Sequence, residues 1–123
     1  MYLLDTNTII DYLGGKFYSN ARNNLDKIID EEINISVINK IELLSFSKVE
    51  QNLLDFVNES NVYRLDENIV DQTIKIRKEH RIKLPDAIIA STALLFNFTL
   101  ITNNTKDFKK LEHLNLINPY NDF

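Results

Sequence analysis

Oxygen-bearing side chains follow the expected strands of this sequence at several widely separated points. Asp5 comes directly after the apolar run Tyr2–Leu4, which is typical of a buried strand. The others lie near helix starts that follow later strands: Glu42, Asp86, Asn104 and Asp107. Because ligands of open α/β sheets bind beyond the carboxyl ends of the strands, we expect these side chains to gather at one edge. Clustered carboxylates repel one another, and Mg²⁺ or Mn²⁺, which prefers carboxylate and water ligands, would relieve that repulsion.

Each of these side chains also has a purely structural explanation when it is taken alone. Asp5 could be a helix N-cap, and Asp86, next to a proline, could be an acid that favours a helix start. Glu42 lies between two apolar residues and is typical of a solvated helix position, whereas Asp107 fits a turn. The combination of these residues, rather than any one of them, indicates a site.

Short apolar runs alternate with stretches of helical spacing along the chain. Strands are expected at Tyr2–Leu4, Ile33–Val37, Val62–Leu65, Thr99–Thr102 and Leu116–Ile117. Helices are expected through Ile9–Leu13, Ser19–Asp30, Ile41–Phe46 with Asn39 as its N-cap, Leu53–Val57, Glu67–Arg81, Asp86–Phe96 and Thr105–Leu111. Strands that are joined by helical crossovers pair in parallel, so the sequence predicts an α/β sandwich. The 123 residues fit a single domain, residues 1–123.

The composition is that of an ordinary globular chain, and it excludes several kinds of site. Hydrophobic residues make up 44% and charged residues 26%, with no cysteine and two histidines. A disulfide scaffold, a thiolate zinc site and a cysteine nucleophile are therefore excluded. No apolar run is long enough to cross a bilayer, and the first residues lack the pattern of a signal peptide. We expect a soluble, cytoplasmic protein that does not contact a membrane.

Four segments carry a recognisable pattern, in a fixed order, over nearly the whole chain. They are LLDTNTIIDYL, INKIELLSF, KLPDAIIASTALLFNFTLITNNTKDF and the closing LINP. The most specific feature is LPDAIIA followed by a T-x-N-x-x-D-F stretch. Together these segments resemble the PIN-domain ribonucleases, especially the VapC-type toxins of toxin–antitoxin systems.

This resemblance implies a fold, an activity and partners. The fold would be a PIN-like three-layer α/β/α sandwich around a mostly parallel sheet, and the activity would be Mg²⁺- or Mn²⁺-dependent endoribonuclease cleavage of RNA. A small antitoxin protein would occlude the site, and the toxin would form a homodimer. Aromatic residues that could line the dimer interface, if exposed, are Tyr2, Phe17, Tyr18, Phe46 and Phe56.

The resemblance also assigns roles to particular residues. Catalysis and metal binding fall on three acids: Asp5, Glu42 and Asp86. The fourth catalytic position falls on Asn104, a neutral residue expected to orient water or a carboxylate. Supporting roles fall on Thr6, Thr102 and Asp107. Many members have an arginine where this chain has Asn103, so one basic contact to the substrate is expected to be missing.

An RNA substrate needs phosphate contacts outside the acid cluster, although the net charge of −4 argues mildly against general nucleic-acid binding. The candidate contacts precede the last expected long helix: Arg77, Lys78, Arg81 and Lys83. Further basic residues near the same segments are Lys75, Lys106, Lys109 and Lys110. Basic runs often serve only as solvated surface, so RNA binding here is a hypothesis.

Other functions remain open at this point. A receiver-like, Mg²⁺-binding signalling domain has a similar length and fold class, but it requires paired acids after the first strand. A PIN nuclease that processes RNA without an antitoxin shares the chemistry of the toxin. A small antitoxin-like reading frame beside the gene would distinguish the toxin from the processing enzyme.

Overall fold

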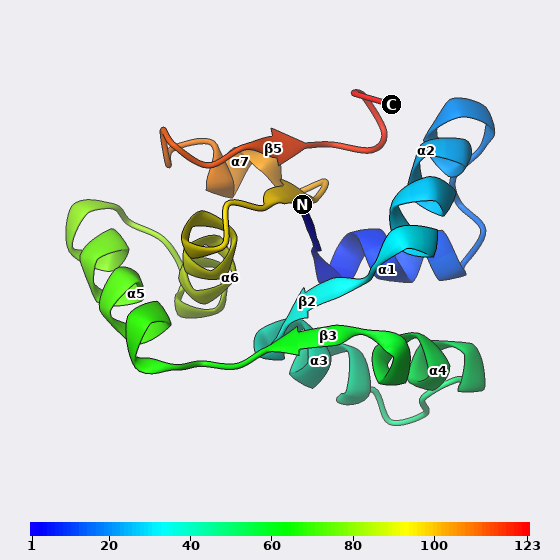
Figure 1. Ribbon diagram of the computed structural model, residues 1–123, viewed down its shortest axis with the longest axis horizontal. Helices are drawn as coiled ribbons and strands as arrows, with labels where there is room; N and C mark the ends of the chain where they lie inside the picture. Colours follow the sequence, from blue (N-terminus) through cyan, green and yellow to red (C-terminus); the bar gives the residue numbers. More distant parts are fainter.

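The computed structural model describes residues 1–123 as five short strands and seven helices (Figure 1). The strands are β1 (Tyr2–Leu4), β2 (Asn34–Ser36), β3 (Asn61–Tyr63), β4 (Thr99–Ile101) and β5 (Leu116–Ile117). The helices are α1 (Thr6–Leu13), α2 (Ser19–Glu31), α3 (Val37–Leu44), α4 (Gln51–Glu59), α5 (Glu67–Glu79), α6 (Leu84–Leu95) and α7 (Thr105–Phe108). The alternation of strands and helices expected from the sequence is confirmed.

All strand pairings are parallel. β1 pairs with β4 and β4 pairs with β5, while β2 pairs separately with β3. The two parts of the sheet are linked by a side chain, because the amide of the buried Asn34 donates to the Tyr2 carbonyl at 3.0 Å. Parallel pairing places the residues that follow β1 and β4, Asp5 and Thr102, at the same edge of the sheet.

Two hydrophobic clusters cover the two faces of the sheet. Neighbouring strand residues point to opposite faces, so Leu3 and Leu100 join one cluster while Leu4 and Ile101 join the other. The first cluster packs against α5 and α6, and the second packs against α1 to α4. Figure 1 shows α5 and α6 on one side of the central strands and α1 and α2 on the other. This arrangement confirms the three-layer α/β/α sandwich.

The start of α3 differs from the sequence-based expectation. Ser36, not Asn39, is the N-cap: its hydroxyl accepts a hydrogen bond from the Ile38 amide at 3.1 Å. Asn39 instead lies in the first turn, where its side-chain oxygen accepts from the Ser36 amide at 2.9 Å. The prediction was wrong because the last strand residue itself supplies the capping hydroxyl, so the helix starts earlier than expected.

Several helix ends also differ. α3 ends at Leu44 and leaves Phe46 outside the helix and 50% exposed, and α7 ends at Phe108 rather than Leu111. Among the other aromatic residues considered for an interface, Tyr18 is exposed, whereas Phe17 and Phe56 are buried. None of the helices has the length and hydropathy needed to cross a bilayer.

Candidate active site

Asp5 lies at the carboxyl end of β1, where it is also the N-cap of α1, and only 6% of it is exposed. Four donors surround its carboxylate. Oδ1 accepts from the Thr6 amide at 2.9 Å and from Asn39 Nδ2 at 3.2 Å. Oδ2 accepts from the Thr102 hydroxyl at 2.7 Å and from Asn7 Nδ2 at 3.2 Å. Asp5 is therefore held from three separate segments of the chain.

Burial raises the pKa of Asp5, and its four hydrogen bonds offset that effect only in part. A carboxylate has about four acceptor positions, so the protein itself fills those of Asp5. The two bonds at 3.2 Å are the weaker ones. Thr6 and Thr102 therefore hold the carboxylate more closely than the two asparagines do.

The two asparagines beside Asp5, Asn7 and Asn39, were not identified as site residues from the sequence. Each is held by a backbone amide: Asn39 Oδ1 accepts from Ser36, and Asn7 Oδ1 accepts from Asn103 at 3.1 Å. Their amide nitrogens thus donate to different oxygens of Asp5. Asn7 could have been found from the sequence, because it lies two residues after Asp5. Asn39 was interpreted only as a helix cap, so its contact with Asp5 was not predicted.

Glu42 lies on α3, and its side chain reaches the first residue of α1. Its Oε1 accepts from the Thr6 hydroxyl at 2.7 Å, and the Thr6 oxygen in turn accepts from Asn39 Nδ2 at 3.0 Å. Thr6 therefore contacts both Glu42 and Asn39. Hydrogen bonds connect Asp5, through Asn39 and Thr6, to Glu42.

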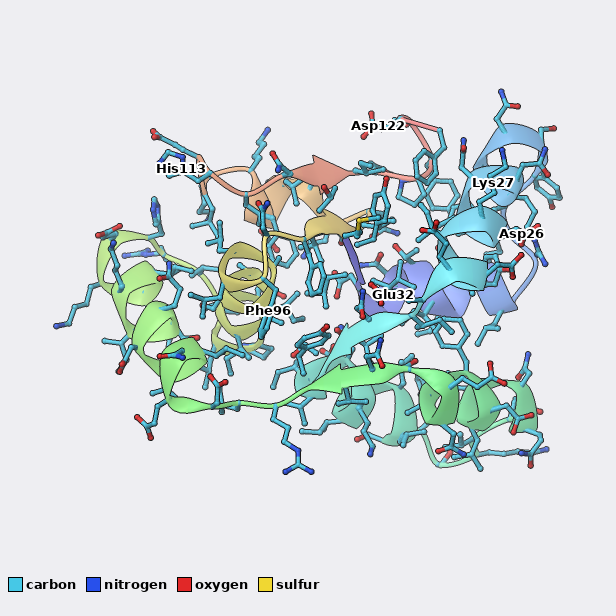
Figure 2. The ribbon with its side chains drawn as sticks, in the orientation of Figure 1. Asp26, Lys27, Glu32, Phe96, His113 and Asp122 are labelled. Carbon is cyan, nitrogen blue, oxygen red and sulfur yellow. The ribbon has the colours of Figure 1, made fainter.

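Asp86 lies in the first turn of α6, next to Pro85, and is half-buried. Burial raises the pKa of Asp86, and Lys83 opposes that shift. The neighbouring carboxylates that raise it further belong to Asp5, Asp107 and Glu42. No hydrogen-bond donor stabilises the Asp86 carboxylate, in contrast to that of Asp5. The four carboxylates that the sequence places at this edge are therefore close enough for three of them to raise the pKa of the fourth, Asp86. Figure 2 labels Phe96, which caps the opposite end of α6 and so lies away from this edge.

The segment after β4 supports Asp5 mainly through Thr102. Thr102 is fully buried, and its oxygen donates to Asp5 and accepts from the Asn104 backbone amide at 3.0 Å. The side chain of Asn104 makes no hydrogen bond to an acid, so this residue takes part through its backbone. Asp107, on α7, faces the same cleft as Asp86.

A cleft of about 380 Å³ opens beside Asp86. Its lining combines two acids with four cations: Asp86, Asp107, Arg77, Arg81, Lys83 and Lys110. The Lys110 ammonium donates to the Arg81 carbonyl at 2.7 Å. Of the RNA-contact candidates, Lys78 lines a neighbouring hollow with His80, and Lys75 lines a different hollow beside Phe96. The cleft therefore places cations directly next to the acid cluster.

No Lys or Arg forms an ion pair with an acid of the cluster, although Lys83 lowers the pKa of Asp86. The two ion pairs of the chain, Lys16–Asp11 and Arg22–Asp26, lie elsewhere. No three acidic or histidine side chains are close enough to hold a metal ion together. Oxygen donors with unbalanced charge in an open arrangement fit Mg²⁺, which usually takes one or two carboxylates and keeps several waters.

Comparisons with known proteins agree with this geometry. The family model described as PIN domain matches residues 2–114. The chain is 31% identical over 130 residues to a protein named Ribonuclease VapC from Rickettsia bellii (strain RML369-C), covering 94% of this chain and 93% of that protein.

Solved structures give the same result. A toxin–antitoxin complex from Klebsiella pneumoniae matches with a TM-score of 0.77 and 29% identity over 98% of each chain. VapBC2 from Rickettsia felis, solved bound to a DNA fragment from the promoter, matches with a TM-score of 0.77 and 29% identity over 95% of this chain and 97% of that one. The fold, the edge at which the acids gather and these matches establish that the chain belongs to the PIN-domain family.

Proposed function

We propose that this protein is a metal-dependent endoribonuclease that cleaves RNA phosphodiester bonds, and that it is the toxin of a toxin–antitoxin pair. The observation that carries the proposal is the arrangement of four acids around one edge of the sheet. Hydrogen bonds link Asp5 to Glu42 through Asn39 and Thr6. Asp86 and Asp107 line one cleft, and no Lys or Arg forms an ion pair with any of the four acids. The relative named as a ribonuclease supports the reaction type. Membership of the PIN family removes the receiver-domain alternative.

Mg²⁺ or Mn²⁺ would be held by one or two of the carboxylates of Asp86, Asp5 and Glu42, with water completing its shell, because no three acids lie close enough to hold it together. Asp86 has the carboxylate that no donor stabilises, and Glu42 keeps one carboxylate oxygen free of hydrogen bonds. When bound, the cation neutralises charge on the phosphate and lowers the pKa of water, which makes that water a better nucleophile.

The side chains themselves divide the remaining work. Glu42 is exposed, its Oε1 is fixed by Thr6, and its other oxygen can orient the attacking water and accept a proton from it. Thr102 and the two asparagines keep Asp5 in one orientation. We propose that the neutral Asn104 contributes its backbone amide rather than a carboxylate, through Thr102.

The cations of the cleft would bind the RNA backbone. Arg77, Arg81, Lys83 and Lys110 share this cleft with Asp86, so a phosphate bound to them lies next to the acids. Such contacts position the strand without reading its sequence. Lys78 lies on the neighbouring hollow, which also includes Arg77 and Arg81, and would extend the same basic surface.

A partly apolar groove at the C-terminal end of α1 suits an antitoxin. It has a volume of about 260 Å³, and its lining includes Ile10, Leu13, Phe46 and Leu53. The groove lies along α1, which begins with Thr6, and just beyond the end of α3, which carries Glu42. A protein segment bound there and continuing along these helices would cover the acids. Phe46→Asp is expected to weaken co-purification of the antitoxin without changing metal binding.

A homodimer is the second partner proposal. Two large aliphatic side chains are exposed beside the acids: Ile41, 57% exposed and adjacent to Glu42, and Leu84, 49% exposed and near Asp86. Pairing of two copies through these side chains would bury them and bring two sites together. Light scattering should give twice the chain mass for the wild type and the monomer mass for Ile41→Asp.

The proposal is tested by titrating Mn²⁺ into the protein by calorimetry and by incubating the protein with total RNA. Asp86→Asn is the test variant, and Asp71→Asn, an exposed acid on α5 away from the cluster, is the matched control. We expect the wild type and the control to bind Mn²⁺ and to cut RNA at discrete positions, and Asp86→Asn to do neither. Equal binding or cleavage by Asp86→Asn would contradict the proposal. A small protein encoded beside the gene that blocks cleavage would favour the toxin over an RNA-processing nuclease.

A further inference from the structure

The buried amide of Asn39 contacts more than the helix that it caps. Asn39 is fully buried, and burying an amide is costly unless its polar atoms are hydrogen-bonded. Its Oδ1 completes the capping box with Ser36, and this is the only bond the helix start requires of it. Both remaining contacts come from Nδ2, and both lead to the acid cluster.

The orientation of this amide is fixed by chemistry. The Ser36 backbone N–H can only donate, so the Asn39 atom that faces it at 2.9 Å must be the oxygen. The amide nitrogen therefore faces Asp5 Oδ1 at 3.2 Å and the Thr6 oxygen at 3.0 Å, and its two hydrogens are used in those bonds.

The Asn39 amide also holds the Thr6 oxygen in place. That oxygen accepts from Asn39 Nδ2 at 3.0 Å, and the same hydroxyl donates to Glu42 Oε1 at 2.7 Å, a carboxylate oxygen that can only accept. One amide thus fixes an oxygen of Asp5 directly and an oxygen of Glu42 through a single hydroxyl.

We propose that Asn39 is a positioning residue that couples Asp5 to Glu42 by holding in place the Thr6 hydroxyl that donates to Glu42. The inference rests on the proposed nuclease function, in which both acids act. It gives Asn39 a role in the reaction beyond the start of α3. Loss of a hydrogen-bond partner behind a metal-binding side chain typically costs about 10–100-fold in metal affinity or activity.

The test compares Asn39→Ala with Asn34→Ala. Asn34 is also buried and its amide makes three hydrogen bonds, none of them to an acid of the site, so it reports the purely structural cost of losing a buried asparagine. Mn²⁺ affinity is measured by calorimetry, and kcat and KM are measured on a single-stranded RNA carrying a fluorophore and a quencher.

We expect Asn39→Ala to lose about 10-fold or more in both Mn²⁺ affinity and kcat, with KM for RNA nearly unchanged, while Asn34→Ala keeps both. A second pair of variants does not disturb the helix cap: Thr6→Val should lower kcat, and Thr6→Ser, which keeps the hydroxyl, should restore it. The kcat losses of Asn39→Ala and Thr6→Val should combine to less than their product, because both act through Glu42.

The inference is overturned if Asn39→Ala behaves like Asn34→Ala in an active wild-type background, or if Thr6→Val cleaves as well as Thr6→Ser. A wild-type protein that neither binds Mn²⁺ nor cleaves RNA is a different result, because it refutes the proposed function itself.

Discussion

Replacing Asp5 by asparagine tests whether its four hydrogen bonds hold the site edge together. The side chain keeps its size, but one oxygen becomes an NH₂ group. If that group replaces Oδ1, it faces the Thr6 amide and Asn39 Nδ2; if it replaces Oδ2, it faces the Thr102 hydroxyl and Asn7 Nδ2. In either orientation two buried donors lose their acceptor.

The cost can be worked from these bonds. A buried donor left without a partner costs about 1–3 kcal/mol, so two cost about 2–6 kcal/mol. The variant also removes a buried negative charge. Because burial raises the pKa of Asp5, that charge disfavours the folded state at neutral pH, and its removal offsets part of this cost. We take a net loss of about 2 kcal/mol, which corresponds to a fall in Tm of about 6–12 °C for a chain of this length.

The assay is thermal unfolding of the metal-free protein at pH 7, followed by circular dichroism. Asp86→Asn is the matched comparison, because the same chemical change there removes no hydrogen bond. Both variants should also lose RNA cleavage by at least about 100-fold. A residue that only supports a metal ligand costs up to about 100-fold when it is lost, and loss of a ligand itself should cost at least as much. An Asp5→Asn protein as stable as the wild type would refute the reasoning, since it would show that the four donors do not depend on the carboxylate.

Three further outcomes are expected. Asp86→Asn should raise the Tm of the metal-free protein by about 2–5 °C, because it removes a charge that burial and three other carboxylates disfavour; calorimetric scans check this, and a fall in Tm would contradict it. The wild-type Tm should rise as the pH falls from 7 toward 5: the raised pKa values of Asp5 and Asp86 mean that the native state binds protons above pH 3.8 that the unfolded chain has released. That rise should be smaller in Asp86→Asn, and an equal rise would point to other groups. Arg77→Ala should raise KM for RNA about 10-fold with kcat unchanged and should weaken the salt dependence of binding, whereas Lys75→Ala, outside the cleft, should do neither.

Much of the fold could be predicted because its signals are local. The apolar run before Asp5, the proline before Asp86 and the alternation of strand and helix patterns depend on residues that are neighbours in the sequence. The parallel pairing follows from that alternation, and with it the edge at which the acids gather. The start of α3 was misjudged because two residues, Ser36 and Asn39, offer cap chemistry within one turn.

The sequence alone determined which acids would meet and at which edge of the sheet, because the direction of each strand decides where the residue after it lies. Only the tertiary structure decided how those acids are held. The bond from Thr102 to Asp5 joins residues 97 positions apart, and the bond from Asn39 to Asp5 joins residues 34 apart. Such contacts depend on side-chain rotamers and on packing between elements, which no local pattern encodes. The same packing leaves Asp86 without a donor beside a cleft of cations, and this asymmetry between the two aspartates is visible only in the folded chain.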